Sequence, residues 1–363
     1  IKGILLSLPR YIKIILMELI YFFNGMFIRN LEFAKAFYKD PECFPARFFG
    51  GQCYTGSSVF ITAGMFASFE TNTYYPARGF QYMADVLIEE MLKNNGEIHY
   101  NEKAVKILIK ENRAVGVKTE KGEYFAENVV SNVDLHSTIN NLTGRENYPG
   151  EILESLDNSV VSDAVFNVYL GLDLPVKELM KYLKNDHIYI YPKDFTPIVD
   201  NDIDNNDHFL KSMLVLTTKD REPNPAPENH SILMISSLVP PGWMNNWHSG
   251  DSRIKKEKYY ELKDKITEIL IKRTEKIIPG LSKHIIVKDA GSPVTFEDYT
   301  DNRGGATVGF TWDPFKGFLP RNKLGAMFLK HPVKNLYQVG SWTQRIGGYG
   351  SSAVSGKKIG QLI

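Results

Sequence analysis

The residues of this chain best suited to contact an electron-rich ligand lie near its carboxyl end, between Gly340 and Gly350. A short apolar strand, 336–339, runs into Gly340, and a loop with Gly347 and Gly348 leads into a predicted helix. Glycine lets the backbone approach a ligand closely, and a helix N-terminus offers unpaired N–H groups and partial positive charge. The segment therefore predicts a cofactor-facing corner. A glycine-rich connection that closes a sheet edge explains the local sequence equally well.

Residues 348–353 match the dinucleotide-binding fingerprint G-x-G-x-x-G/A, and they follow a predicted strand. That fingerprint also requires a second parallel strand and an acidic residue about 20 positions further on. The sequence stops at Ile363, so we expect no Rossmann unit at this loop.

The tail resembles the C-terminal FAD-binding signature of the carotenoid isomerase, retinol saturase and bacterial phytoene desaturase group of FAD-dependent oxidoreductases. In that group a strand N-L-Y-x-V-G leads to W-T-x-P-G-G-G-V-P-G and then to a helix carrying S-G. Arg345 and Ile346 stand where the group has Pro and the first Gly, and residues 349–351 replace Val-Pro-Gly. The positions that match without a gap are Asn335, Leu336, Tyr337, Val339, Gly340, Trp342, Thr343, Gly347, Gly348, Ser355 and Gly356.

Three further blocks resemble the same group and occur in the expected order. The first contains a turn ending at Gly79, strands that include Val105, and Ser131, where the group places a second turn beside the cofactor. The second, 220–227, resembles D-P-x-x-A-P-x-G. The third, 292–309, resembles T-P-x-T-x-x-x-Y-T-x-N followed by a glycine-rich turn. Four blocks in order favour the family but do not distinguish its substrates.

The resemblance implies a mixed α/β (α+β) fold, in which a substrate domain of mixed β-sheet and helices interrupts an incomplete FAD-binding domain of the glutathione-reductase/amine-oxidase type. Residues 1–70, with apolar helices, and 136–324 would form the two parts of the substrate domain. Residues 71–135 and 325–363 would form the FAD-binding segments. The group carries its phosphate-binding βαβ unit at the N-terminus, and this sequence opens at Ile1 without one. We therefore expect that its beginning has been lost, by truncation or as a natural remnant.

The resemblance also implies which residues contact FAD. Backbone N–H groups of the α-helix start at 348–350 would stabilise the negative charge that grows at flavin N1 and O2 on reduction. Ser341 stands where related flavoproteins often carry an acid bonded to the ribityl chain. Thr343 and Tyr349 are candidates to face the substrate, although simple packing explains both equally well. The implied cofactor contacts are Gly79, Val105, Ser131, Gly340, Ser341, Thr343, Gly347, Gly348, Tyr349 and Gly350.

A flavin supplies hydride chemistry itself, which agrees with a sequence that shows no nucleophilic triad and no acid–base pair. We assign no catalytic residue. The resemblance predicts an FAD-dependent desaturase, saturase or isomerase that acts on a carotenoid, a retinoid or another long isoprenoid lipid. Two alternatives stay open, namely a non-catalytic lipid-binding or membrane-associated remnant and a relative of the flavin amine oxidases. An aromatic content of 12% suits an apolar tunnel but also an ordinary core.

The composition describes a globular chain of 363 residues with room for two domains. A net charge of +1 gives no reason to expect a nucleic-acid partner. Cys43 and Cys53 are the only cysteines, which predicts reduced thiols and a cytoplasmic location rather than a disulfide framework. The eight histidines show no metal-binding spacing. The oligomeric state does not follow from the sequence.

The first 29 residues are strongly apolar, but their longest uncharged run, 19–28, is too short to span a bilayer. One interpretation is an amphipathic helix that covers a core. The other is peripheral membrane contact through residues 10–29, with aromatic side chains inserted at the interface.

Periodicity and turn residues predict the remaining elements. Helices are expected over 83–95 and 254–278, and strands over 97–100, 104–110, 114–119, 123–127, 128–133, 160–172, 210–217 and 231–238.

Overall fold

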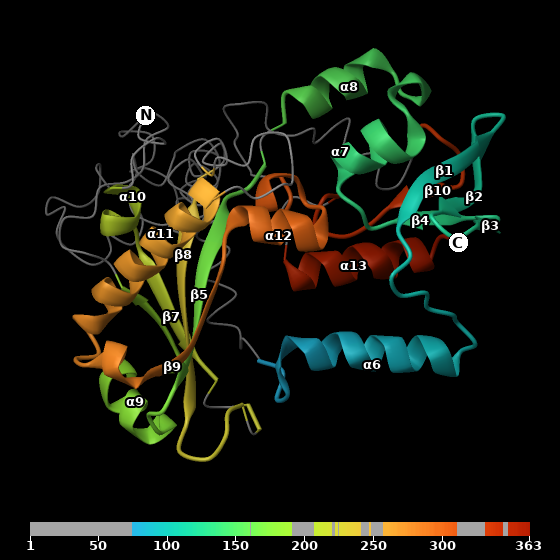
Figure 1. Cartoon of the computed structure of the whole chain (residues 1–363). Helices are drawn as coiled ribbons and strands as arrows, with labels where there is room; N and C mark the ends of the chain where they lie inside the picture. The colour runs from blue at the N-terminus through green and yellow to red at the C-terminus, as the bar shows by residue number, and fades with distance from the viewer. Residues whose placement is uncertain are drawn as a thin grey trace, which may run out of the picture.

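The computed structural model describes residues 75–159, 161–190, 207–219, 222–223, 225–240, 247, 257–310, 331–343 and 348–363. An antiparallel sheet of five strands stands at one end of this structure, and two smaller sheets stand at the other (Figure 1). Helices α12 (Pro293–Thr300) and α13 (Tyr349–Gly360) lie between them. These helices connect the region of the larger sheet to the region that contains the tail.

The five-stranded sheet has the order β6–β7–β8–β5–β9, and every neighbouring pair is antiparallel. Burial alternates along β5, β7 and β8, because successive side chains of a strand point to opposite faces. One face therefore contributes the main core, and the other face is only half-buried. The strands are β5 (Ala164–Leu172), β6 (His187–Ile190), β7 (Leu214–Thr218), β8 (Ser231–Val239) and β9 (Ile285–Gly291).

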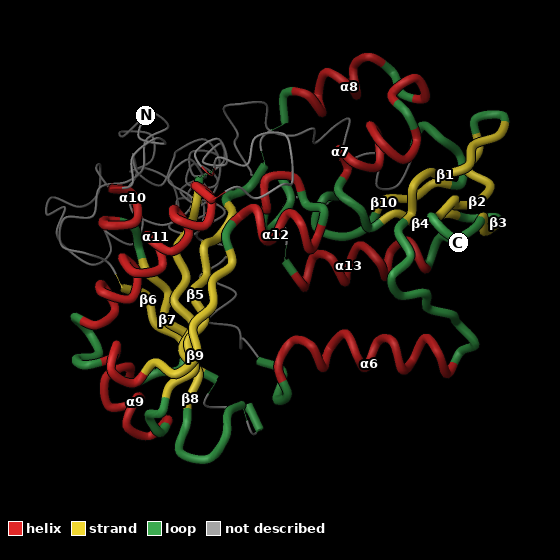
Figure 2. The backbone as a smooth tube through the Cα atoms, viewed as in Figure 1, coloured by secondary structure: helices red, strands yellow, loops and turns green. Residues whose placement is uncertain are grey.

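Three helices cover the core face of this sheet (Figure 2). They are α9 (Val176–Leu183), α10 (Asp207–Lys211) and α11 (Glu257–Glu275). Beneath them the ring of Phe166 stacks on Trp247 with centroids 5.7 Å apart. Arg273 of α11 donates hydrogen bonds to the backbone carbonyls of Phe209 and Ser212, which ties α11 to the end of α10.

The smaller sheets form a separate layer at the other end. Strands β1 (Ala104–Lys110), β2 (Arg113–Thr119) and β3 (Glu123–Phe125) are antiparallel neighbours. Strand β4 (Val129–Ser131) pairs in parallel with β10 (Leu336–Gln338), although more than 200 residues separate them. A second core joins these sheets to the helices beside them, through Ile107, Ala114, Val129, Leu142, Val333 and Leu336.

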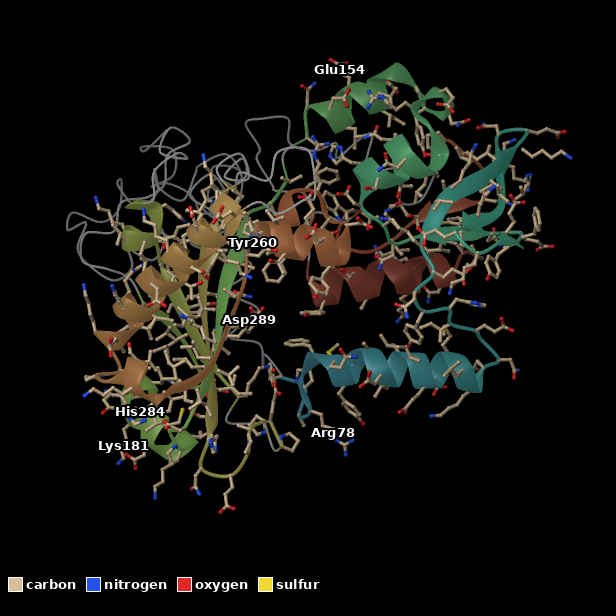
Figure 3. The ribbon with its side chains drawn as sticks, viewed as in Figure 1. Arg78, Glu154, Lys181, Tyr260, His284 and Asp289 are labelled. Atoms are coloured by element: carbon tan, nitrogen blue, oxygen red, sulfur yellow. The ribbon has the colours of Figure 1, made fainter. Side chains whose placement is uncertain are left out.

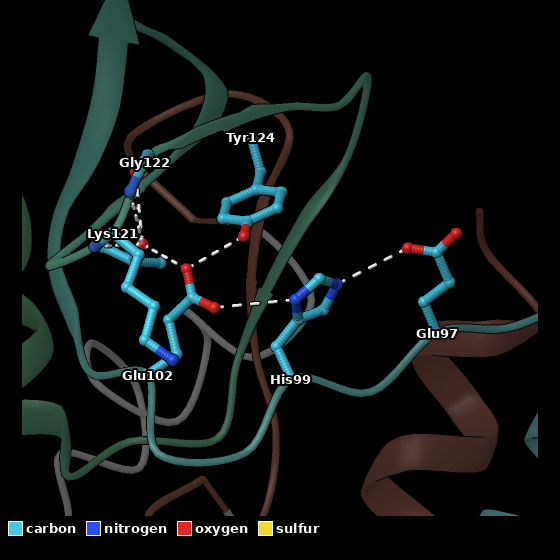
Figure 4. Close-up of polar contacts among 7 residues, drawn as sticks. Glu97, His99, Glu102, Lys121, Gly122 and Tyr124 are labelled. Carbon is cyan, nitrogen blue, oxygen red and sulfur yellow. Dashed lines mark hydrogen bonds and ion pairs between the residues drawn. The ribbon is translucent and has the colours of Figure 1, made fainter.

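A buried carboxylate anchors the segment that leads into β1 (Figure 4). One oxygen of Glu102, whose side chain is 4% exposed, accepts hydrogen bonds from the hydroxyls of Thr119 (2.6 Å) and Tyr124 (2.8 Å). The other oxygen lies 3.5 Å from Nδ1 of His99. The predicted strand at 97–100 is therefore wrong, because side-chain contacts hold this segment and it forms no ladder with the described strands.

Other predicted elements agree with the structure, apart from 210–217. That stretch begins with the end of α10, and only its second half belongs to β7. The predicted strand at 160–172 begins at residue 164, and the predicted helix at 254–278 is described as α11. The remaining helices are α6 (Gly79–Lys93), α7 (Leu135–Ser137), the π-helix η1 (Thr138–Thr143), η2 (Arg145–Asn147), α8 (Gly150–Asp157), η4 (Leu281–His284) and η5 (Arg303–Gly305).

Among the described residues, no helix combines the length and apolar character that crossing a bilayer requires. The expected membrane-contact segment, 10–29, lies outside the described residues, as do Cys43 and Cys53.

Candidate functional site

The parallel pair β4–β10 brings the first block of the chain against the tail. Because parallel strands end at the same edge of a sheet, the turn after Ser131 meets Gly340 there. The amide of Val339 donates a hydrogen bond to the carbonyl of Ser131 (2.8 Å). Gly340 has a φ of 86°, and a Cβ at this position would overlap Oδ1 of Asn132. The close approach of the two segments therefore requires glycine.

The side chain of Ser131 points into the protein. Its hydroxyl lies 2.9 Å from that of Thr138 and also accepts a hydrogen bond from the amide of Val133 (3.3 Å). Ser131 is 5% exposed. The hydroxyl of this serine thus fixes the turn. Its backbone carbonyl is the group that contacts the tail.

Helix α13 is held directly against the end of β10. The amide of Gly340 donates to the hydroxyl of Ser355 (2.8 Å), and this hydroxyl donates to the carbonyl of Ser352 (2.7 Å). Ser355 is completely buried. Gly340 and Ser355, two positions at which the tail matches the resembling group, thus make the contact that positions the helix.

Within the described residues, the N-terminus of α13 is open. Gly348, with a φ of 105°, precedes the helix, and its carbonyl accepts the first helical hydrogen bond from Ser352 (3.0 Å). A Cβ at Gly348 or Gly350 would meet nothing within 4 Å. The amides of Tyr349 and Gly350 have no acceptor in the described part of the chain. Free donors with open space before them suit an electron-rich ligand.

Two other predicted tail contacts, Thr343 and Ser341, pack against neighbouring backbone. The hydroxyl of Thr343 donates to the carbonyl of Gly340 (2.7 Å), so it closes the turn after β10. The carbonyl of Ser341 packs on Gly309, where a Cβ would lie 2.6 Å from it. The third resemblance block therefore meets the tail at Gly309. Gly347 lies outside the described residues.

Buried polar groups lock the third block to the tail. Trp342 donates from Nε1 to Asn302 (2.9 Å), and its ring meets the edge of His136. Nδ1 of His136 lies 3.3 Å from the Arg303 guanidinium. Since arginine only donates, Nε2 of the neutral imidazole carries the proton and donates to Ser159 (3.1 Å).

The charge states of this cluster follow from its burial. Burial, and then the neighbouring Arg303, lowers the pKa of His136 to about 4. The carboxylate of Asp134 accepts from the amides of His136 and Arg303, both at 2.7 Å. Burial nevertheless raises the pKa of Asp134. The imidazole is neutral at neutral pH and acts as a packing and hydrogen-bonding group.

The start of α6 also reaches the tail. Phe80 stacks on Tyr349 with ring centroids 4.4 Å apart and planes 10° apart. Tyr75 meets the edge of Phe80 at 5.2 Å. Arg78, labelled in Figure 3, lies directly before α6 with its guanidinium 4.8 Å from the centre of the Tyr82 ring. Aromatic contacts therefore connect α6 to the N-terminus of α13.

An ion pair from the second block completes this connection. Lys219 donates to Tyr75 (2.8 Å) and to Glu222 (2.6 Å), and the Tyr75 hydroxyl donates to Glu222 as well. The Glu222 carboxylate also lies against Gly79, 3.1 Å from the position of a Cβ. Burial opposes the charge on Lys219, but its hydrogen bonds to Glu222 and Tyr75 outweigh burial and raise its pKa.

The structure thus brings Ser131, Gly340, Ser341 and Thr343 together where β4 and β10 end. Helix α13, which begins at Gly348, Tyr349 and Gly350, is held against this edge through Ser355. Gly79 lies at the start of α6, whose Phe80 stacks on Tyr349. Val105 lies in β1, in a different sheet from the β4–β10 pair, with 40% of its surface exposed. Sequence reasoning missed Tyr75, Lys219 and Glu222. The only indication of these residues in the sequence was that they lie in or beside two blocks that resemble the same family.

Known proteins were compared with the chain as a whole. No family model matches it. Prolycopene isomerase 2 of an Oncidium hybrid cultivar is 26% identical over 320 residues, which cover 85% of this chain and 50% of that protein. The lycopene-forming phytoene desaturase of Pseudescherichia vulneris is 22% identical over 374 residues, covering 100% of this chain and 69% of that protein. The chain is homologous to carotenoid isomerases and desaturases.

A solved structure shows the fold. A putative protoporphyrinogen oxidase from Exiguobacterium aligns over 84% of this chain and 55% of its own, with a TM-score of 0.52 and 16% identity. The predicted resemblance to the carotenoid isomerase and phytoene desaturase group and the predicted mixed α/β fold are thereby confirmed. The chain spans about half the length of the first curated relatives that it matches.

Proposed function

We propose that this chain is part of an FAD-dependent oxidoreductase that desaturates, saturates or isomerises a carotenoid, a retinoid or another long isoprenoid lipid. The observation that carries the proposal is the open N-terminus of α13, held by Ser355 against the edge where β4 and β10 end. Homology to carotenoid isomerases and desaturases supports the same cofactor and substrate class.

The residues present fit a flavin. The free amides of Tyr349 and Gly350 offer donors to an electron-rich ring edge, and the missing side chains at Gly348 and Gly350 leave room for one. A bound flavin would supply the hydride chemistry. The chain would supply the helix N-terminus that favours negative charge, and Tyr349 beside it, held by Phe80.

We also propose a division of labour along the chain. Residues 71–135 and 325–363 would bind the cofactor, because β4, β10 and α13 meet there. Residues 1–70 and 136–324 would bind the substrate. The five-stranded sheet belongs to the second part, and its half-buried face carries apolar side chains suited to a lipophilic small molecule, namely Val165, Val215, Ile232, Met234 and Leu238.

Flavin binding tests the proposal most directly. The chain, and in parallel the chain extended by its upstream sequence, is incubated with FAD, desalted and scanned for flavin absorbance. We expect Gly350→Asp to weaken FAD binding about tenfold, because it adds a negative charge where the donors must face the flavin. Gly356→Asp is the matched control, since this glycine also has open space around its Cα but lies further along α13.

Both proteins staying colourless would refute the FAD proposal and favour a non-catalytic lipid-binding protein. If flavin binds, product analysis with a carotenoid and with an amine separates the remaining possibilities. Conversion of the carotenoid is expected. Peroxide release from amines alone would instead assign the chain to amine oxidation.

We further propose that the protein is cytoplasmic and contacts the membrane peripherally through residues 10–29. Their sequence combines aromatic side chains with flanking basic residues, which suits an interfacial segment. Co-sedimentation with liposomes should fall when Phe22, Phe23 and Phe27 are changed to Ser. Equal co-sedimentation of the parent and the triple variant would contradict this proposal.

A further inference from the structure

The half-buried face of the five-stranded sheet carries a polar pair at its centre. Asn167 of β5 lies directly opposite Ser236 of β8 and, on its other side, opposite Gly291 of β9. Asp289, labelled in Figure 3, is paired with Tyr169 on the same face at the β9 edge. The other side chains of this face on β7 and β8 are mostly apolar.

The polar pair is incompletely hydrogen-bonded. The Asn167 amide donates from Nδ2 to the Tyr169 hydroxyl (3.1 Å). Its Oδ1 is buried and has no hydrogen-bond partner within the described structure. The hydroxyl of Ser236 has no partner there either. A buried acceptor without a partner costs about 1–3 kcal/mol, and native proteins leave few of them.

An aromatic wall borders the pair on one side. Gly291 has no side chain, which allows the ring of Phe296 from α12 to lie 3.3 Å from the position of a Cβ there. The Tyr169 ring lies 3.7 Å from the same point. Asn167 and Ser236 are therefore two polar groups set among apolar and aromatic ones, an arrangement that can orient a mostly apolar ligand.

We propose that Asn167 and Ser236 bind a hydroxyl group of the lipid substrate. A hydroxyl can donate to Oδ1 of Asn167 and exchange a hydrogen bond with Ser236, which satisfies both groups, whereas a pure hydrocarbon satisfies neither. The inference rests on the proposed lipid substrate and narrows it to isoprenoids that carry an alcohol.

The position of the pair fits a long substrate. Five residues before Asn167, the amide of Ser162 donates to the carbonyl of Gly309 (2.8 Å), and Gly309 packs on Ser341 of the tail. At about 3.3 Å per extended residue, Asn167 lies within about 17 Å of that contact. A long hydrocarbon chain held by its hydroxyl at Asn167 can therefore reach the proposed flavin corner.

A paired binding measurement tests this inference without any flavin. Phytol and phytane, a saturated hydrocarbon with the same carbon skeleton and no hydroxyl, compete with a fluorescent fatty-acid probe for the purified chain, each delivered from the same detergent. The measured quantity is the ratio of their affinities. We expect Asn167→Leu and Ser236→Ala each to lower the preference for phytol about fivefold, as the loss of one neutral hydrogen bond predicts. Phytane affinity should not fall.

Thr217→Val is the matched control, because it removes a hydroxyl from the same face whose partner is already His187 (2.8 Å). This variant should keep the parent preference. Two variants guard against misfolding, so if Asn167→Leu does not fold, Ser236→Ala decides the test. An unchanged preference in the folded variants overturns the hydroxyl site and leaves the lipid proposal standing. Failure of both ligands to bind the parent overturns both proposals.

Discussion

His136 makes the stability of this protein depend on pH in a defined direction. Its pKa is about 4 in the folded protein, because burial and Arg303 disfavour the imidazolium, whereas an unfolded chain has the ordinary value of about 6.5. Below pH 6.5 the unfolded state binds a proton that the folded state does not bind until the pH nears 4. The stability gained from neutral His136 is therefore complete above pH 6.5 and is lost as the pH falls.

The two pKa values set the size of the effect. At pH 5 these two values raise the equilibrium constant for unfolding about 30-fold above its value at high pH. The free energy of unfolding therefore falls by about 2 kcal/mol. Urea unfolding at pH 7 and pH 5 measures it. His136→Gln keeps a donor for Ser159 but cannot take up a proton, so the parent should lose about 2 kcal/mol more than the variant between these pH values. Other titrating groups, including Asp134, are common to both proteins.

Equal losses in the parent and in His136→Gln would refute the reasoning, because they would mean that His136 is protonated as easily in the folded protein as in the unfolded chain.

Other positions give shorter predictions. Gly340→Ala should destabilise the fold by about 1–3 kcal/mol or more in thermal unfolding, because the φ of 86° disfavours a side chain and Asn132 leaves no room for a Cβ. An unchanged melting temperature would contradict the close approach of Gly340 to Asn132. Phe80→Ala should speed exchange of the Ser352 amide, whose hydrogen bond to Gly348 opens α13, and of the amides in the following turn, since a stacked pair contributes about 0.5–1.5 kcal/mol; unaltered exchange would argue against the coupling of α6 to α13. Burial also lowers the pKa of His331 to about 4, so His331→Gln should reduce the loss of stability between pH 7 and pH 5, and an acid sensitivity equal to that of the parent would exclude this histidine.

Local sequence predicted the elements whose periodicity is uninterrupted. The strand at 104–110 has the bounds expected for it, and the tail forms the expected strand and helix. The strand at 210–217 was partly wrong, because short apolar runs suit a buried helix end as well as a strand. The tail was the most informative segment, since its glycines and its Ser355 each have a defined geometric role.

Contacts between distant segments could not be read from local patterns. Tyr75 and Glu222 are 147 residues apart in sequence, and no periodicity signals their meeting. The Asn167–Ser236 pair depends on strand register, which long-range pairing sets. The sequence likewise does not show which way the side chains of Ser131 and Thr343 point, because that depends on their hydrogen-bond partners.

The pairing of β4 with β10 has a consequence for how the chain is made. The whole five-stranded sheet lies between these two strands in the sequence, so a ribosome must synthesise it before β4 can find its partner. The entropy of closing so long a loop rises only slowly with its length, but folding through distant contacts is slow. During synthesis the β4 edge stays unpaired with β10 while the intervening sheet is free to fold. The proposed cofactor corner is thus completed only after the five-stranded sheet has been synthesised, once β10 and α13 have left the ribosome.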